Sequence, residues 1–508
     1  MLETLRSRFD PSEFSLEEQA PVDSDPGPTS LKTPVVFIPG DGIGPEVTRA
    51  ARDVIDAAYP HIEWLDHEAG QSVPLADRSR GVPEKTLQAI ADTGLVLKGP
   101  LGTPIGVGGK SANVTLRKNF ELFANIRPVS ELPGVPTRFS GAGIDMVIVR
   151  ENVEDLYAGI EYMQTPDVAQ CLKLISRLGS EKINRLAFEL ARAQGREKVT
   201  CATKANIMKM TEGLFKRVFE EAAADYPEIA ANHQIIDNCA QQLVMAPEQF
   251  DVIVTTNMNG DILSDLAAGL VGGLGLAPSA NIGQSVAMFE AVHGTAPDLA
   301  GRDIANPIAL IRSGVMMLRH IGAFQAATSI EHALYATLES GRHLTPDIAG
   351  SGSAGTTRDF TAAVIDNLGL VSASVPERPV SAMRIPRARP SRAGSVARGF
   401  VGIDVFVEWD GHVDALADRL AKAIRRLPFR LELISNRGMQ VFPQNHATTE
   451  MVNHWRCRFF HDGTVGRQKE QQAICALLEA INNVCTWMHV ERLQRFDDRR
   501  AYSKAQGE

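Results

Sequence analysis

Two aspartates, Asp261 and Asp265, follow the short apolar stretch DVIVTTN and are four residues apart. The stretch is typical of a buried strand, and the residues after it predict a helix, on which positions i and i+4 share one face. Two adjacent carboxylates repel each other unless a cation lies between them or each faces water. Carboxylate oxygens without a nearby His or Cys favour Mg²⁺ or Mn²⁺ over zinc. The pair is therefore a candidate metal site; the alternative is two ordinary acids in the first turns of a helix, stabilised by its dipole.

Basic side chains that suit a small polycarboxylate precede this pair in the chain. Arg117 and Lys118 lie in TLRKN, Arg127 lies in NIRPV, and Arg150 ends the apolar strand DMVIVR. An arginine fork binds a carboxylate through two parallel hydrogen bonds, so several arginines together fit several carboxylates. The alternative for each is an ordinary surface arginine. Arg150 is the exception, because its place at the end of an apolar strand favours a buried or binding role.

Three further polar residues lie near the ends of expected strands: Lys204, Asp237 and Asn257. In α/β sheets, ligands bind at the carboxyl ends of the strands. A later loop, HGTAPD, has a backbone of small residues suited to wrap an adenosine, with Asp298 as an acceptor for ribose hydroxyls. The alternative for this loop is a structural turn.

The alternation of apolar strands and amphipathic helices predicts an α/β fold with a mostly parallel sheet. GDGIG after the strand at 35–38 lacks the full GxGxxG spacing, so it indicates a tight turn as readily as a dinucleotide site. Residues 156–177 alternate and predict a hairpin arm of the kind exchanged with a partner subunit. The segment 270–306 is interpreted as loop-rich.

The ends of the chain differ from its centre in composition. Residues 1–33 are acidic with Pro and Ser, which predicts a disordered leader. Residues 372–399 are rich in Pro and Arg and are expected to form a solvated linker. The remaining residues, 400–508, have the βαββαβ pattern of a small ferredoxin-like α+β domain.

The chain has 508 residues, 44% of them hydrophobic and 22% charged, as in globular enzymes of several domains. A formal net charge of −9 argues against a nucleic-acid binder. No apolar run is long enough to span a membrane. The six cysteines are scattered without a CxxC motif, which indicates free thiols in a reducing compartment, and with no secretory signal the cytoplasm is expected.

Eight sequence blocks resemble, in order, those of the isocitrate/isopropylmalate dehydrogenase family: IPGDGIGPEV, LKGPLGTP, SANVTLRK, NIRPV, VIVRENVEDLYAGIE, KANIMK, NMNGDILSD and HGTAPD. The resemblance covers residues 34–370, and the C-terminal unit resembles the extra domain of longer bacterial isocitrate dehydrogenases. The fold it implies has a large α/β domain and a small domain bearing the arm, with these ranges: 34–122 and 273–371 for the large domain, 123–272 for the small domain, 156–180 for the arm.

The resemblance also implies roles for single residues. Substrate carboxylates and hydroxyls would be bound by Ser111, Asn113, Arg117, Arg127 and Arg150. Mg²⁺ or Mn²⁺ would be bound by Asp261 and Asp265 together with the partner subunit's Asp237. Catalysis would use Tyr157 and the partner subunit's Lys204, which makes the enzyme at least a homodimer with shared sites; a tetramer through the C-terminal domain is left open.

The implied activity is the oxidative decarboxylation of isocitrate to 2-oxoglutarate and CO₂. Family members that use NADP usually have a Lys–Tyr pair where this chain has Asp298 and Leu299. Because an aspartate accepts hydrogen bonds from free ribose hydroxyls and repels a phosphate, NAD is expected. Other positions that match the family's nucleotide-lining residues are Thr103, His293, Gly294, Thr295, Ala296 and Asn306.

The sequence leaves two alternative functions. Isopropylmalate or homoisocitrate dehydrogenase activity is disfavoured by Ser111 and Asn113, because isopropylmalate enzymes have apolar residues there. A non-catalytic regulatory subunit is disfavoured because such subunits tend to lose the Tyr or the Lys, and this chain keeps both Tyr157 and Lys204.

Overall fold

The computed structural model describes most of the chain, and the residues it describes are 32–73, 81–102, 111–350, 354–375, 378–388, 396–443, 450–463 and 467–504. The predicted leader, apart from its last two residues, and the predicted nucleotide contact Thr103 lie outside them. Within these ranges, no helix combines the length and the apolar character needed to cross a membrane.

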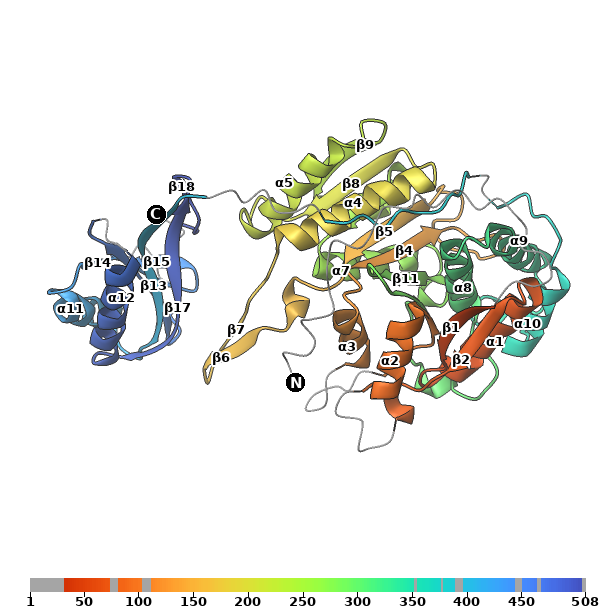
Figure 1. Ribbon diagram of the computed structural model, residues 1–508, viewed down its shortest axis with the longest axis horizontal. Coiled ribbons are helices and arrows are strands. Elements are labelled where there is room, and N and C mark those ends of the chain that lie inside the picture. The colour runs from red at the N-terminus through yellow and green to blue at the C-terminus, as the bar shows by residue number, and fades with distance from the viewer. Residues whose placement is uncertain are drawn as a thin grey trace, which may run out of the picture.

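A single ten-stranded sheet runs through the main body of the molecule (Figure 1). From one edge to the other, its strands are β2 (Ile62–Asp66), β1 (Thr33–Ile38), β3 (Leu95–Lys98), β12 (Ala287–Ala291), β11 (Pro278–Ile282), β4 (Ala124–Ser130), β5 (Asp145–Glu151), β10 (Val252–Thr255), β8 (Lys198–Thr203) and β9 (Ala230–Ile235). Strands within each outer group are parallel, whereas β11 and β4 in the centre pair antiparallel with their neighbours. The predicted α/β class is confirmed. The division into a large and a small domain stays a prediction, because one sheet continues through both.

Helices cover both faces of this sheet, and alternate residues of each strand pack into different cores. On β1, Val35 and Phe37 belong to the large core on one face, whereas Val36 and Ile38 belong to a core on the other. Strands buried on both faces must be apolar throughout, which explains runs such as VVFI. The large core is covered by α1 (Gly44–Ala58), α4 (Arg177–Ala193), α5 (Thr211–Ala223), α8 (Ile308–His320), α9 (Phe324–Ser340) and α10 (Thr357–Asp366). The opposite face is covered by α2 (Glu84–Thr93), α3 (Ala112–Asn119), α6 (Ile236–Met245) and α7 (Asn257–Leu270).

The interpretation of residues 270–306 as loop-rich is wrong for its middle part. Strands β11 and β12 form an antiparallel pair in the centre of the sheet, and every residue of both is buried. Their sequences, PSANI and AMFEA, contain small and polar residues and lack the β-branched pattern by which strands are recognised. Tertiary pairing with β4 and β3 therefore determines these two strands.

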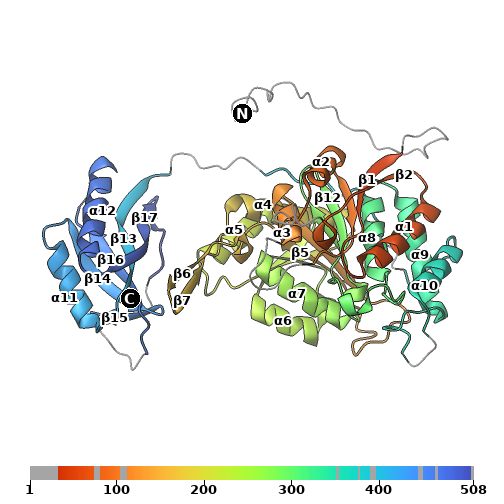
Figure 2. The ribbon, with the colours of Figure 1, turned by 90° about the horizontal axis from the view of Figure 1, so that it is seen from below.

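The predicted arm is a hairpin of β6 (Glu161–Thr165) and β7 (Val168–Cys171) that projects from the main body. Figures 1 and 2 both show its tip beside the C-terminal domain. Two side-chain hydrogen bonds join them: Thr165 to Asn453 at 2.9 Å, and His489 with Gln164 at 3.2 Å.

The C-terminal domain is a separate antiparallel sheet with two helices on one face (Figure 2). Its elements are β13 (Arg398–Glu408), α11 (Val413–Ile424), β14 (Phe429–Asn436), β15 (Met439–Phe442), β16 (His454–His461), α12 (Arg467–Asn482), β17 (Thr486–Phe496) and β18 (Arg499–Arg500). The central order β14-β16-β13-β17 is that of the predicted ferredoxin-like arrangement, to which the short edge strands β15 and β18 are added.

The segment between the two domains lies along the main body over the residues that the structure describes. In Figure 1 it crosses past α4 as an extended chain. Arg378 forms an ion pair with Asp145 at 2.6 Å, and the Ser381 amide donates to the Ala193 carbonyl. Residues 378–388 are thus attached to the body, whereas composition alone predicted a solvated linker.

Candidate active site

Helix α7 carries the two aspartates and begins where the fully buried strand β10 ends. Its first turns face the middle of β4 and the end of β5, where the predicted Arg127 and Arg150 lie. The side chain of Asp261 is 36% exposed and that of Asp265 is 53% exposed, so both carboxylates keep one side open. The structure therefore places both on one helix face, as the spacing predicts.

Arg127 and Arg150 converge on these carboxylates from adjacent strands. Arg150 pairs with Asp261 at hydrogen-bond distance, and its other guanidinium atoms donate to Asn257 at 2.8 and 3.1 Å. Arg127 lies 3.5 Å from Asp261 and 3.2 Å from Asp265. Both arginines are almost entirely buried, so the carboxylates are needed as counter-charges.

The charges of this cluster affect one another's protonation. Burial and the neighbouring Arg150 charge lower the pKa of Arg127 to about 10, which leaves it charged at neutral pH. Burial opposes ionisation of Asp261, but Arg150, Tyr157 and Arg127 outweigh it and lower its pKa. The pKa of Asp265 is raised by burial and, despite Arg127, also by the charge of Asp261. The cluster thus holds two guanidinium cations and at least one firmly ionised carboxylate.

Tyr157 completes the cluster from a short 3₁₀ turn after β5. Its hydroxyl donates to Asp261 Oδ2 at 2.5 Å, and the Arg150 guanidinium lies over its ring, 5.0 Å from the centroid. Burial, followed by the Asp261 interaction, raises the pKa of the phenol. The hydroxyl is therefore a protonated donor at neutral pH, placed beside the arginines.

A buried ion network that sequence reasoning missed holds Arg117 in place. Glu290 on β12 pairs with Lys98 on β3, accepts from Asn281 at 2.7 Å and lies 3.4 Å from Arg117. Burial alone would favour the neutral acid, but Lys98 and Arg117 lower the Glu290 pKa to about 2. The signal was hidden because Lys98 and Glu290 are neighbours only through the β3–β12 pairing.

Three buried polar atoms of the predicted site have no hydrogen-bond partner among the described residues: Asn113 Oδ1, Arg117 Nε and His293 Nε2. Such atoms are rare in folded proteins, because an unpaired buried polar group is costly. All three belong to residues predicted to contact substrate or nucleotide. Ser111, which is also predicted to contact the substrate, is the residue before α3, the helix that carries Asn113 and Arg117.

The predicted nucleotide loop is attached to the glycine-rich turn after β1. The Ile43 amide donates to the Thr295 carbonyl at 2.9 Å, and a Cβ at Gly42 would lie 2.0 Å from that same oxygen.

Within the loop, His293 Nδ1 contacts the Gly294 carbonyl, and Ala296 adopts a left-handed backbone before the 3₁₀ turn Pro297–Leu299. Asp298 in that turn is exposed. The Asn306 amide donates to Asp347 at 2.8 Å.

The remaining predicted residues, Lys204 and Asp237, lie apart from this cluster and pair with each other at 2.6 Å. Asp237 lies in the first turn of α6, slightly past the strand end expected for it. The Lys204 interaction lowers the pKa of Asp237. Within the described ranges no group of three or more His, Cys, Asp or Glu side chains could hold a metal ion. One chain thus supplies Asp261 and Asp265, an oxygen-only pair that suits Mg²⁺ or Mn²⁺, and the contribution of the partner subunit's Asp237 stays a prediction.

Residues 34–364 match the family model "Isocitrate/isopropylmalate dehydrogenase". The chain belongs to this family. Residues 398–508 of this family member match the model "Bacterial isocitrate dehydrogenase, C-terminal domain", in agreement with the expectation for its second domain.

Two relatives and one solved structure are similar to this chain over nearly its whole length. A protein of Thermus thermophilus named isocitrate dehydrogenase [NADP] is 54% identical over 93% of this chain and 96% of its own length. One of Rickettsia bellii with the same name is 42% identical over 94% of this chain and 99% of its own. A crystal structure of a Thermus thermophilus protein, 52% identical, superposes with a TM-score of 0.89 and covers 94% of this chain and 96% of the other.

These names contradict the expected NAD cofactor and the NAD-dependent activity inferred with it, because both relatives are named for NADP. That expectation depended on Asp298 and Leu299, and it is wrong. Asp298 is exposed and Leu299 is 37% exposed, so water and salt screen the repulsion that the carboxylate exerts on a phosphate. One exposed acid is too weak a determinant of nucleotide choice.

Gly260 in α7 has no room for a side chain, and Gly260→Ala tests the packing under Arg150. The new Cβ would lie 2.6 Å from Arg150 Cγ, so we expect the free energy of unfolding to fall by about 1–3 kcal/mol. Gly269→Ala is the matched control in the same helix. Because there is open space around its Cβ position, this change should raise the free energy of unfolding by about 0.5–1 kcal/mol. Chemical denaturation measures both, and equal effects of the two changes would contradict this packing.

Glu151, at the end of β5, gives stability a defined pH dependence. Burial raises its pKa to about 7, although the Val153 and Glu154 amides donate to it and oppose the shift. Between pH 4.5 and 7 the folded chain keeps a proton that the unfolded chain loses, so stability falls as pH rises through this window, by at most about 3 kcal/mol.

In Glu151→Gln this fall should be absent, with the exposed Glu161→Gln as control. The measurement is the free energy of unfolding of the three proteins at pH 5, 6, 7 and 8. An unchanged slope in Glu151→Gln would show that Glu151 is ionised in the folded protein throughout the range.

Proposed function

We propose that this protein oxidises and decarboxylates isocitrate to 2-oxoglutarate and CO₂ with NADP as the hydride acceptor. The observation that carries the proposal is the convergence of Arg127, Arg150 and Tyr157 on Asp261. The names of the two long relatives support the substrate and the nucleotide. A hydroxy tricarboxylate that is held through a divalent ion requires both kinds of side chain, cationic ones for its carboxylates and acidic ones for the ion.

The substrate's carboxylates would bind to Arg117, Arg127 and Arg150. Each guanidinium is preorganised: Glu290 holds Arg117, Asn125 accepts from Arg127 Nε at 2.6 Å, and Asn257 accepts from Arg150. Because Arg127 and Arg150 are buried, their side chains lose little entropy on binding a carboxylate. Asn113 Oδ1, which has no partner among the described residues, is available to a substrate hydroxyl or acid group.

Asp261 and Asp265 would hold Mg²⁺ or Mn²⁺ together with the partner subunit's Asp237, and the ion, when bound, would supply Lewis-acid polarisation of the substrate's hydroxyl and carboxylate. NADP, when bound along residues 293–296, would supply the acceptor for the hydride from C2. His293 Nε2, which has no partner in the described part of the chain, lies in this loop and fits a polar contact with the nucleotide.

The chain's own residues would move the protons. The partner subunit's Lys204 would take the proton of the substrate hydroxyl as C2 is oxidised. Tyr157, protonated because its pKa is raised, would donate a proton to C3 after CO₂ leaves, as a general acid. Asp261 orients the phenol by accepting its hydrogen bond, and it would accept this hydrogen bond again once the product has left.

Initial rates with the purified chain test activity and nucleotide together. With isocitrate and Mg²⁺, we expect kcat/KM for NADP to exceed that for NAD at least tenfold. Excess EDTA should abolish turnover, and added Mg²⁺ should restore it. Isopropylmalate serves as the control substrate, and faster turnover of isopropylmalate, or no turnover at all, would contradict the proposal.

A mixing experiment tests the shared site, because Tyr157 and Lys204 contact different groups within one chain. Tyr157→Phe and Lys204→Met should each be nearly inactive alone. In a mixed dimer, one of the two sites combines an intact Tyr157 with an intact Lys204. Equal mixing with random reassociation should therefore restore about a quarter of the wild-type rate. If activity does not rise above that of the separate variants, both residues act within one subunit.

A further inference from the structure

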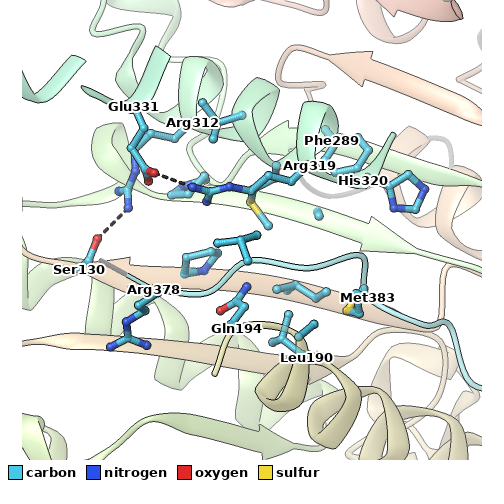
Figure 3. A pocket seen from close by; sticks show the side chains of 18 of the residues that line it. Ser130, Leu190, Gln194, Phe289, Arg312, Arg319, His320, Glu331, Arg378 and Met383 are labelled. Atoms are coloured by element: carbon cyan, nitrogen blue, oxygen red, sulfur yellow. Dashed lines mark hydrogen bonds and ion pairs between the residues drawn. The ribbon is translucent and has the colours of Figure 1, made fainter. Parts of the chain in front are cut away.

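A cavity of about 220 Å³ lies on the face of the sheet opposite the candidate active site. Strand β4 separates the two: Arg127 points to the site, and its neighbours Ile126 and Pro128 line the cavity. Helices α4 and α8 form its sides, and residues 378–383 of the segment between the domains cross over it (Figure 3). No role in the proposed reaction accounts for this space.

The cavity is apolar at one end and charged at the other. Figure 3 shows Phe289, Met383 and His320 toward one end, and Ser130, Arg312 and Arg378 toward the other. Between them the wall is formed by apolar residues, among them Ile126, Ala280, Ile282 and Met316. A space of this kind fits an amphipathic molecule with a polar head and an apolar body.

The charges at the polar end do not balance. Arg378 pairs with Asp145, and Arg196 pairs with both Asp145 and Asp251. Arg319 pairs with Glu331 at 2.5 Å.

Arg312 is different, because its two hydrogen bonds go to neutral acceptors: the Leu276 carbonyl at 2.7 Å and the Ser130 hydroxyl at 2.8 Å. Among the residues that the structure describes, it has no carboxylate within ion-pair distance. A cation beside an apolar cavity gains most from an anion that brings its own apolar surface.

We propose that this cavity is a second binding site of the protein and takes a medium-chain aliphatic monocarboxylate. Its carboxylate pairs with Arg312, and its chain lies against Ile282, Phe289 and Met316. One unbalanced cation calls for one negative charge. The volume sets the length: an apolar cavity of about 150 Å³ holds a benzene ring, so 220 Å³ holds a chain of about eight carbons. The site is independent of the proposed reaction and does not require it.

The covering segment provides a way in. It is an extended chain without secondary structure, attached near the cavity by the Arg378–Asp145 ion pair and the Ser381–Ala193 hydrogen bond. Val380 at its middle is 38% exposed. Displacing this segment breaks these contacts and the packing of Met383 on the core, and it uncovers the cavity without unfolding a helix or strand.

Isothermal titration of the full-length protein with sodium octanoate tests the proposal. We expect saturable binding with one site per chain, and butyrate should bind at least tenfold more weakly because each methylene is worth roughly fourfold. 1-Octanol, which lacks the charge, should also bind at least tenfold more weakly than octanoate.

Three variants locate the site. Arg312→Met should weaken octanoate binding at least tenfold and leave 1-octanol binding unchanged. Met316→Trp fills the apolar end and should abolish binding of both molecules. Arg358→Met is the control, because Arg358 is exposed and distant from the cavity lining, and it should bind octanoate as the wild type does. Thermal unfolding confirms that each variant is folded.

The proposal is overturned if the wild type does not bind octanoate at millimolar concentration. It is equally overturned if folded Met316→Trp binds octanoate as tightly as the wild type, because the carboxylate would then be held elsewhere, for example by the arginines of the candidate active site. Equal binding of octanoate and 1-octanol would reject the role of Arg312. Isocitrate turnover is not a readout here, so failure of this proposal and failure of the proposed function are distinguishable.

Discussion

Two buried guanidinium groups, Arg127 in the middle of β4 and Arg150 near the end of the adjacent strand β5, lie side by side, and their mutual repulsion is the constraint on which the site depends. Burial and this repulsion lower the pKa of Arg127, yet both groups remain charged because Asp261 lies between them. Buried guanidinium groups that are held in place bind the carboxylates of a ligand strongly, because little water competes for them. The strand β10 and the helix α7 are placed so that this single carboxylate reaches both arginines.

The packing around the arginines follows from the same requirement. Gly260 is needed because the Arg150 stem occupies the volume of a Cβ there. Asn125 and Asn257 accept from the two guanidinium groups, and Glu290 plays the corresponding part for Arg117. Each cation thus has a partner that fixes its direction. Asn113 Oδ1 and His293 Nε2, which have no hydrogen-bond partner among the described residues, belong to residues predicted to contact substrate and nucleotide, so a ligand there could satisfy them.

Local features of the sequence predicted much of this arrangement. The placement of Asp261 and Asp265 side by side can be predicted because a helix fixes which residues share a face. The burial of Arg150 can be predicted because its strand is apolar up to that residue. The ferredoxin-like order of the C-terminal domain likewise follows from alternating patterns of strands and helices.

Features that depend on pairing between distant segments could not be predicted from the sequence. β11 and β12 are strands because of their neighbours, and Lys98 meets Glu290 only through the β3–β12 register. The nucleotide was misjudged for a related reason: the local charge of Asp298 is visible in the sequence, but its exposure, and so its weak effect, is not.

The segment that leads to the C-terminal domain has a mechanical consequence. Arg378 and Ser381 attach it to the β5 and α4 side of the sheet, and Gln284, in the turn between β11 and β12, donates to its Pro386 carbonyl at 2.9 Å. It therefore joins the turn between β11 and β12 to the β5 and α4 side of the same sheet across strand β4, and moving these parts of the sheet relative to each other would break one of these contacts.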